Sequence, residues 1–347
     1  MSVYRIYRRI REMSITAKEL ARQLGVSPAA VSMALNNKPG VSTATRARIV
    51  RAAEAAGYDF SRQASRTAAH GDIYCVIYRA NNAILNYSPI FTELTDGIEQ
   101  GCRDNGFHLR TLQLYEQTDD FARIAEELRG SDCAGIILLG TEISAEVCRK
   151  FLRLNIPMVL LDSYFETIDC SSILINNAQG AYLATNYLID NYHRQPGHLK
   201  SSYSIQNFFE RDVGFKRAVR EHGMSVGNSV IHELSPSIEG AMSDMLDLID
   251  SHADLAGCYF ADNDLIAIGV IKALQARHIR VPEDIPVIGF DNIREGQIVD
   301  PALTTIDIPR LFMGQTAVRQ LIRQISYPVP HTVKTEISTS IVSRDSA

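Results

Sequence analysis

The feature that most constrains the fold is a regular alternation of short apolar runs and longer amphipathic stretches, which begins at Ile73. The apolar runs have the length of strands and few polar positions, which indicates strands buried on both faces of a parallel sheet. About 270 residues in this pattern exceed one compact core, so we expect an α/β body of two lobes with parallel sheets. The apolar runs cover residues 73–78, 134–140, 157–162, 171–177, 256–262 and 286–292, and the helical stretches include 91–105, 178–191, 211–222, 241–251 and 264–277.

The residues before this body predict an all-α head that contains a helix-turn-helix. Thr16 and Glu19 form a capping box at the start of one helix, and Gly25 is suited to end that helix. Ser27 and Pro28 are an N-cap and a first helical residue, so a second helix follows after a three-residue turn. A third helix is expected between Ser42 and Gly57. The positions expected to face inward are Leu20, Ala21, Leu24, Val31, Ala34, Leu35, Ile49, Val50 and Ala53.

The second helix of this head is expected to enter the major groove of DNA. Ser32 and Asn36 are short and polar, which suits phosphate contacts, whereas Ala29 and Met33 would contact thymine methyl groups. A helical mini-domain that binds protein is the alternative interpretation. The residues expected to contact DNA are Thr16, Ser27, Pro28, Ala29, Ser32, Met33, Asn36, Ser42 and Arg66.

The distribution of charge supports the DNA-binding interpretation. Residues 1–70 contain 12 Lys and Arg against 4 Asp and Glu, whereas the rest of the chain contains 23 against 36. A basic head on an acidic body is typical of a nucleic-acid-binding module joined to a second functional unit.

Several other classes of protein are disfavoured. No apolar run reaches the length of a membrane helix or a signal peptide, so we expect a cytoplasmic protein. The six cysteines are scattered, which predicts buried thiols rather than a zinc site or a disulfide framework. The nucleotide-binding and hydrolase motifs are missing, so we expect neither an enzyme nor a cofactor or metal. Residues 262–264 resemble part of a calcium loop but lack its following glycine and distal glutamate.

Polar residues at the carboxyl ends of the predicted strands mark a ligand site, because ligands of such sheets bind at these ends. Carboxylates, amides and an arginine accept and donate hydrogen bonds in the pairs that vicinal sugar hydroxyls require. Each aspartate could instead cap a helix, and for Asp264 we favour a cap or a packing role. The residues expected to bind the ligand are Ser88, Phe91, Asp162, Asn207, Arg211, Asn263 and Asp291, with Arg211 opening a helix.

The head motifs resemble those of the lac repressor family of bacterial transcriptional regulators. The resemblance is carried by residues 16–21, 24–36, 41–42, 45–46 and 56–58, although this chain has Met33 where the family often has arginine. Residues 211–215, 261–269, 281–292 and 301–306 extend the resemblance to the body. It implies a periplasmic-binding-protein-like body whose lobes are joined by three connecting strands. It also implies effector contacts by Arg211, Asn263 and Asp291, with Asp162 and Asn207 as further candidates.

The linker and the N-terminal segment depart from the family pattern. The family's linker becomes a hinge helix that wedges a leucine into the minor groove. Residues 60–72 contain no leucine, so we predict a weaker or absent wedge, with Arg66 contacting the minor groove by its charge. Residues 1–12 are either a start-site artefact before a true start at Met13, which we favour, or a basic arm that adds phosphate contacts.

The predicted protein is a sequence-specific DNA-binding repressor that binds a pseudo-palindromic operator as a homodimer. A small carbohydrate between the lobes would control its operator affinity; a protein co-effector or a non-sugar ligand is the alternative. No terminal heptad pattern predicts a tetramer helix. The predicted division is 1–12 as an extra segment, 13–59 as the head, 60–72 as the hinge linker, and 73–347 as the effector-binding and dimerisation domain, with a first lobe of about 73–162 and 293–325 and a second of about 163–292 and 326–347.

Overall fold

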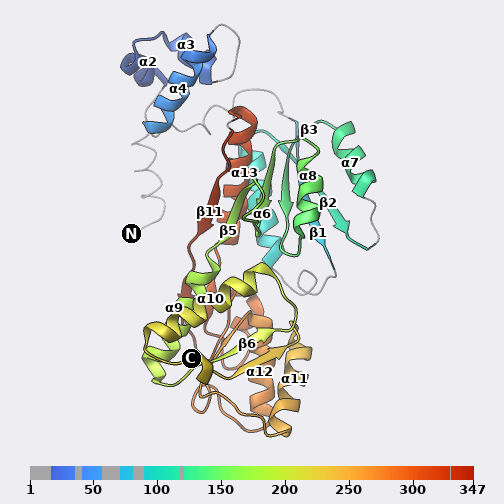
Figure 1. The fold of residues 1–347 in the computed structure, drawn as a ribbon, viewed down its shortest axis with the longest axis vertical. Coiled ribbons are helices and arrows are strands. Elements are labelled where there is room, and N and C mark those ends of the chain that lie inside the picture. The colour runs from blue at the N-terminus through green and yellow to red at the C-terminus, as the bar shows by residue number, and fades with distance from the viewer. Residues whose placement is uncertain (1–16, 36–40, 57–70, 81–89, 118–120, 329) are drawn as a thin grey trace.

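The computed structural model describes residues 17–35, 41–56, 71–80, 90–117, 121–328 and 330–347. Its described part contains a three-helix head and two α/β lobes with parallel sheets, which confirms the predicted fold class (Figure 1). Within these ranges, no helix is long and apolar enough to cross a membrane.

The head forms the predicted helix-turn-helix. Helix α2 (Ala17–Leu24) and helix α3 (Pro28–Leu35) are separated by three residues, and Gly25 lies in the left-handed region with φ +65°. The Ser27 side chain accepts a hydrogen bond from the Ala30 amide at 3.1 Å, as expected of an N-cap. Helix α4 (Thr43–Ala55) completes the head, and Ser42 caps it by accepting from the Thr45 amide at 3.2 Å.

The head encloses a small apolar core that all three helices supply. Every position predicted to face inward belongs to this core or packs against it. The burial of these residues orients α3, because its remaining positions must then face solvent. The fully buried members are Leu20, Ala21, Val31, Ala34, Leu35, Ile49 and Ala53.

The first lobe is built on a six-stranded parallel sheet with the order β11-β5-β4-β3-β1-β2. The inner strands β1, β3, β4 and β5 are mostly buried because helices cover both faces, whereas the edge strands β2 and β11 are partly exposed. Side chains alternate along β1: Ile73, Cys75 and Ile77 pack towards α6 and α13, whereas Tyr74 and Val76 pack towards α7 and α8. The elements are β1 (Asp72–Arg79), α6 (Ile90–Asp104), β2 (His108–Tyr115), α7 (Phe121–Gly130), β3 (Cys133–Leu139), α8 (Ala145–Leu152), β4 (Met158–Leu161), β5 (Ser171–Ile175), α13 (Arg310–Ser326) and β11 (Lys334–Ile337).

The second lobe contains a four-stranded parallel sheet with the order β7-β6-β8-β9. Its helices again cover both faces, with α11 and α12 on one cluster of apolar side chains and α9 and α10 on the other. A short antiparallel pair, β10 with β12, lies beside β9 through isolated bridges. The elements are α9 (Asn177–Tyr192), β6 (Gly197–Ser201), α10 (Gln206–Glu221), η1 (Val226–Asn228), β7 (Ile231–Leu234), α11 (Ile238–Asp250), β8 (Tyr259–Ala261), α12 (Asp264–Ala276), β9 (Val287–Ile288), η2 (Arg294–Gln297), β10 (Thr305–Asp307) and β12 (Ser340–Val342).

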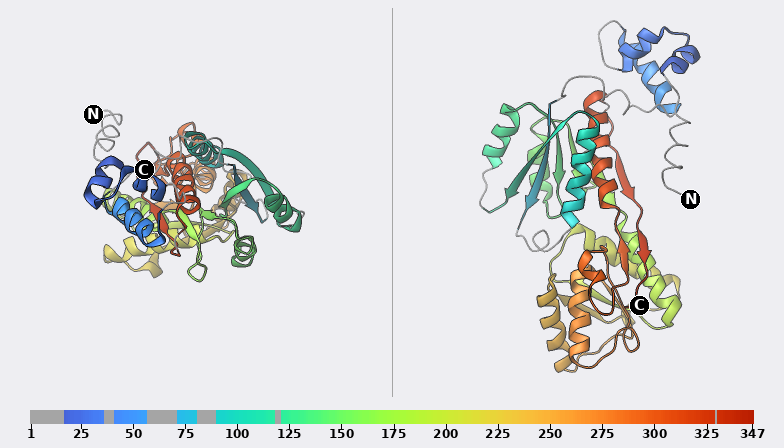
Figure 2. Two further views of the ribbon diagram at one scale, coloured as in Figure 1. Left: turned by 90° about the horizontal axis from the view of Figure 1, so that it is seen from above. Right: turned by 180° about the vertical axis from the view of Figure 1, so that it is seen from behind.

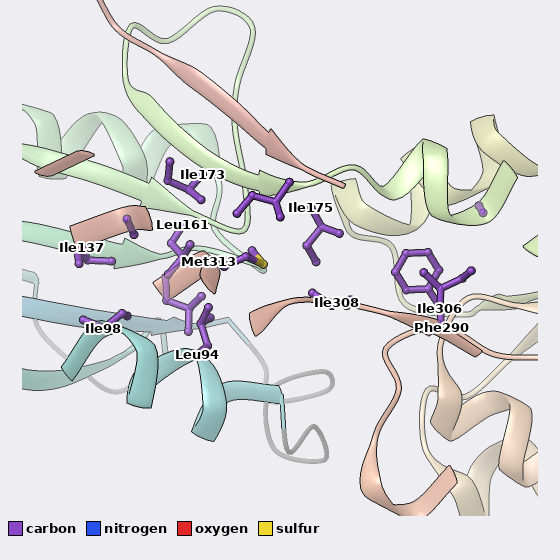
Figure 3. Packing of buried hydrophobic residues seen from close by; sticks show 14 of the residues in the cluster. Leu94, Ile98, Ile137, Leu161, Ile173, Ile175, Phe290, Ile306, Ile308 and Met313 are labelled. Carbon is purple, nitrogen blue, oxygen red and sulfur yellow. The ribbon is translucent and has the colours of Figure 1, made fainter. Parts of the chain in front are cut away.

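The chain crosses between the lobes three times, in agreement with the three predicted connections. The crossings follow β5, precede α13 and join β11 to β12, and Figure 1 shows β5 and β11 side by side leading towards the second lobe. One apolar cluster continues across these crossings. Figure 3 shows Ile175, Ile308 and Met313 between the first-lobe core and Phe290 and Ile306 of the second lobe.

Helices α6 and α13 pack closely on one face of the first sheet, where Figure 2 shows them side by side in cyan and red. Gly97 and Gly314 allow this approach, because a Cβ atom at Gly97 would lie 2.2 Å from the Leu311 carbonyl oxygen and one at Gly314 would lie 2.3 Å from that of Leu94. This packing places the first residue of α13 next to the crossings.

Two features differ from the sequence predictions. The predicted lobe ranges place residues 171–175 and 334–337 in the second lobe, whereas the structure pairs both β5 and β11 in the first sheet. Pairing at a sheet edge depends on contacts between distant segments, which local patterns do not report. The prediction that Arg211 opens a helix is wrong, because α10 begins at Gln206 and contains both Asn207 and Arg211.

Candidate functional site

The start of α3 and its outer face carry several of the residues that the sequence predicts to contact DNA. Ser27, Pro28, Ala29 and Ser32 are exposed, whereas Met33 is half-buried. Ser42, at the start of α4, is also exposed. Thr16, Asn36 and Arg66 lie outside the described residues.

A pocket lies where the two lobes meet. Both lobes supply polar side chains to it, and apolar residues from the crossings fill the spaces between them. Figure 3 shows four of its apolar lining residues, Leu94, Ile175, Ile308 and Met313, close together at the junction of the lobes. All five predicted ligand residues with described side chains line this pocket: Asp162, Asn207, Arg211, Asn263 and Asp291.

Asp162 is the acidic residue that the first lobe contributes. It follows β4 with φ 63°, and its carboxylate accepts hydrogen bonds from the Thr141 hydroxyl at 2.6 Å and the Asn207 amide at 3.0 Å. Burial raises the pKa of Asp162 to about 6, against the opposing effect of these two donors. Because Asn207 belongs to α10, its bond to Asp162 joins the two lobes directly across the pocket.

Arg211 is held on the second-lobe wall by bonds within that lobe. Its Nε donates to the Asn177 side chain at 3.0 Å, its Nη2 donates to Asp291 at 3.2 Å, and its Nη1 donates to the Asp262 carbonyl. The guanidinium carbon also lies 3.6 Å from the centre of the Phe290 ring. This position in α10, one turn after Asn207, brings both side chains to the same pocket.

Asp291 follows β9 and forms an ion pair with Arg211. Its backbone has φ 113°, and its amide donates to the Ile306 carbonyl at 2.9 Å. Burial raises the pKa of Asp291, while the positive charges of Arg211 and Arg310 oppose that shift. The position of the Asp291 carboxylate is therefore fixed both by the backbone hydrogen bond and by the ion pair with Arg211.

Asn263 combines a structural role with its place in the pocket. It is the N-cap of α12, and its Oδ1 accepts a hydrogen bond from the Ile266 amide at 2.9 Å. Its amide nitrogen is consequently the group that can donate to a ligand.

The two carboxylates that flank Asn263 serve packing. Asp262 accepts from the Ser201 amide at 2.8 Å and lies 2.8 Å from His198 Nε2. Asp264 accepts from the Ile293 amide and from the Thr305 hydroxyl at 2.8 and 2.5 Å. Asp264 therefore connects the start of α12 to the segment that leads out of the second lobe.

Arg310, the first residue of α13, lines the pocket but was not among the residues predicted from the sequence. Its side chain is 6% exposed, and its Nη1 donates to Glu93 at 3.3 Å. Its Nε and Nη2 are buried and have no hydrogen-bond partner among the described residues. The sequence pattern predicts this helix, because Pro309 is followed by Met313, Ala317 and Leu321 at helical spacing. The same pattern does not indicate that the first residue of the helix lines a pocket.

The remaining expected contacts are not described at the side-chain level. Ser88 lies outside the described residues, and Phe91 lies in the first turn of α6 with its side chain outside them. The structure brings no group of three or more metal-ligating side chains together in the described ranges, and the six cysteines are free thiols.

Comparisons with known proteins match both parts of this architecture. Residues 16–60 match the family of bacterial regulatory proteins called the lacI family, and residues 185–347 match a periplasmic binding protein-like domain. The chain is 31% identical over 337 residues to the HTH-type transcriptional repressor PurR of Vibrio vulnificus, covering 95% of this chain and 98% of that protein.

Solved structures of regulators share the fold. The complex of the transcriptional regulator CelR with cellobiose has a TM-score of 0.72 at 23% identity, covering 96% of this chain and 100% of that chain. The lac repressor dimer bound to its operator and the anti-inducer ONPF has a TM-score of 0.68 at 19% identity, covering 96% and 98%.

This chain belongs to the lacI family of bacterial regulatory proteins. It is a DNA-binding transcriptional repressor of that family, with a helix-turn-helix head and a periplasmic-binding-protein-like body.

Proposed function

We propose that a small polyhydroxylated ligand, a carbohydrate, binds in the pocket between the lobes and controls the affinity of this repressor for its operator. The observation that carries this proposal is the convergence of Asp162 from the first lobe with Asn207, Arg211, Asn263 and Asp291 from the second on one pocket. A ligand that contacts both walls changes the relative free energy of lobe arrangements, which is the requirement for control at a distance.

The chemistry of the lining suits such a ligand. Asp162 and Asp291 accept hydrogen bonds, and Asn207, Asn263 and Arg211 donate them, so neighbouring hydroxyl groups could each find a partner. The apolar residues supply surfaces for the less polar face of a sugar ring. The apolar lining consists of Leu94, Ile175, Ile205, Phe208, Leu265, Ile293, Ile308 and Met313.

The head would bind DNA in a homodimer, as the lac repressor does in its operator complex. We assign DNA contacts to the exposed residues at the start of α3, with residues 13–59 as the DNA-binding domain, 60–72 as the hinge linker and 73–347 as the ligand-binding and dimerisation domain. Two heads related by a two-fold axis would recognise a pseudo-palindromic operator. The assigned contacts are Thr16, Ser27, Pro28, Ala29, Ser32, Met33, Asn36, Ser42 and Arg66.

The hydrogen bond between Asn207 and Asp162 would couple ligand binding in the pocket to the position of the DNA-binding head. It holds the two walls together at 3.0 Å, and a ligand that replaces or reinforces it favours one inter-lobe angle. That angle would set the spacing of the two linkers in a dimer. A coupling of about 1–3 kcal/mol between ligand and operator is typical of such systems.

The test measures ligand binding and operator binding on the full-length protein. A panel of mono- and disaccharides is screened by the shift in melting temperature, and the operator is selected from random DNA. We expect at least one sugar to raise the melting temperature and to change operator affinity. Arg211→Ala should abolish both ligand effects while operator binding persists. Arg277→Ala, which removes an exposed charge from the same lobe, is the matched control and should behave as wild type.

A response that survives unchanged in Arg211→Ala would show that the ligand binds elsewhere. The absence of a melting shift with every sugar would overturn the carbohydrate assignment and favour the alternative, a protein co-effector or a non-sugar ligand. The comparison with CelR, which was solved with cellobiose, supports the carbohydrate assignment.

A further inference from the structure

The guanidinium of Arg310 is a buried cation with donors that no described residue satisfies. The side chain is 6% exposed, and only Nη1 has an acceptor, which is Glu93. Nε and Nη2, which form one straight edge of the guanidinium, are buried without a hydrogen-bond partner. Among the described residues that line the pocket, Arg310 is the only one with such orphaned side-chain atoms. A buried donor without an acceptor is costly and calls for an explanation.

The charges around Arg310 leave its positive charge incompletely balanced. The side chain of Glu93 is 62% exposed, so water and salt weaken its attraction for Arg310. The acidic groups that face Arg310 from the second lobe are Asp291 and Asp264. Asp291 already forms an ion pair with Arg211 at 3.2 Å. Burial, together with the nearby charge of Asp291, raises the pKa of Asp264 to about 8, which disfavours its ionised form near neutral pH.

We propose that the Nε–Nη2 edge of Arg310 binds an oxyanion of the effector, so that the effector is an acidic sugar derivative carrying a carboxylate or a phosphate. This inference rests on the proposed pocket and names the class of ligand that it takes. Two parallel N–H groups of arginine match the two oxygens of a carboxylate or a phosphate, and an anion also neutralises the buried charge. A neutral hydroxyl group could accept one bond but would leave the charge unbalanced.

The position of Arg310 in the fold strengthens this assignment. Arg310 is the first residue of the 17-residue helix α13, and the preceding Pro309 makes no side-chain capping bond. The N-terminus of a helix carries partial positive charge and favours anions. An oxyanion at Arg310 would therefore lie at the first-lobe wall, while hydroxyl groups of the same ligand face Arg211, Asn263 and Asp291 on the second.

The experiment compares neutral sugars with their acidic counterparts by calorimetric titration of the full-length protein at constant ionic strength. Each set contains the parent sugar, its uronate and its phosphate ester, for example glucose, glucuronate and glucose 6-phosphate. Inorganic phosphate and acetate serve as bare anions.

The proteins are wild type, Arg310→Met, Arg310→Lys and Arg149→Ala. Methionine retains the apolar stem, lysine retains the charge without the two-donor edge, and Arg149 is an exposed arginine on α8 of the same lobe.

We expect one acidic member of a set to bind more tightly than its neutral parent. Arg310→Met should weaken binding of that acidic member by about 10- to 100-fold and weaken binding of the parent sugar much less. Arg310→Lys should recover only part of the loss, and Arg149→Ala should behave as wild type. Whether the uronate or the phosphate ester binds more tightly identifies the source of the oxyanion.

Two kinds of outcome overturn the inference, and they are distinguishable. If neutral sugars bind as tightly as their acids, or if Arg310→Met weakens both equally, Arg310 does not bind an oxyanion, while the pocket keeps its proposed function. If no sugar, acidic or neutral, binds the wild-type protein, the proposed function fails together with the inference.

Discussion

The two walls of the pocket each present one buried arginine, but they hold it in different ways. On the second-lobe wall, every nitrogen of Arg211 donates to a residue of the same lobe. On the first-lobe wall, Arg310 uses one nitrogen for a largely exposed glutamate and leaves two nitrogens without a partner in the described part of the chain. The second-lobe wall is therefore preorganised by its own hydrogen bonds, whereas the first-lobe wall has N–H donors that are available to a ligand.

This difference separates two roles that look alike in a sequence. A fully bonded arginine fixes the shape of a site and keeps its carboxylate neighbour in place. A partly bonded arginine costs stability in the free protein, and that cost is recovered when a ligand supplies the acceptor.

The largest effect is expected for Arg211→Met. The variant leaves Asp291 buried without its cation and removes donors to Asn177 and Asp262. Breaking a buried ion pair by removing one partner costs about 3–5 kcal/mol. Urea unfolding followed by circular dichroism measures the loss. Arg277→Met, at an exposed pair with Asp250, should lose less than about 1 kcal/mol. Equal losses in the two variants would contradict the structural role of Arg211.

A smaller effect is expected for Asn263→Ala. Loss of the N-cap of α12 should cost about 0.5–2 kcal/mol of unfolding free energy. Ser237→Ala removes the cap of α11 in the same lobe but lies outside the pocket lining, so it should cost a similar amount. Only Asn263→Ala should also weaken ligand binding by calorimetry. If both variants bind ligand as wild type does, Asn263 acts as a cap alone.

An effect of comparable size depends on pH and concerns Asp162. The pKa of Asp162 in the folded state is about 6, which lies above the unfolded value of 3.8. The folded state therefore favours the protonated carboxyl group. The resulting contribution to the free energy of unfolding is fully present below about pH 4 and is lost as pH rises through about 6. Asp162→Asn removes this titration. The melting temperature of Asp162→Asn should therefore rise relative to that of wild type as the pH increases from 4.5 to 7.5. A constant difference between the two proteins across this range would show that Asp162 does not have a raised pKa.

The smallest effect on stability is expected for Arg310→Met. Removing a buried cation with unsatisfied donors should leave the unfolding free energy within about 1 kcal/mol of wild type, or raise it. Urea unfolding in the absence of ligand measures the free energy of unfolding of Arg310→Met and compares it with that of Arg211→Met. A loss as large as that of Arg211→Met would show that Arg310 is a structural arginine, and the contrast between the two walls would disappear.

Three of the five predicted ligand residues in the pocket share one position. Asp162, Asn263 and Asp291 each follow a strand of a parallel sheet, so the general rule that ligands bind at the carboxyl ends of such strands is enough to locate them. Asn207 and Arg211 lie in one helix at a spacing of four, which places them on one face. The pocket lining contains all five.

The pocket residues that local patterns do not predict reach it through long-range packing. Thr141 follows β3 and is oriented by its bond to Asp162, and Arg310 arrives through the packing of α13 on α6. That packing depends on glycines separated by more than two hundred residues, Gly97 and Gly314. The same limit applies to β5 and β11, whose pairing in the first sheet is a contact between distant segments.

Local physical chemistry along the chain is sufficient for the three-helix head, the alternating α/β body and the polar strand ends, because caps, turn residues and periodicity act over a few neighbouring residues. Only the folded arrangement decides how two arginines of the same chemistry differ. Whether a buried guanidinium is satisfied depends on which distant groups surround it, and in this protein those groups surround Arg211 on every side and leave one edge of Arg310 open.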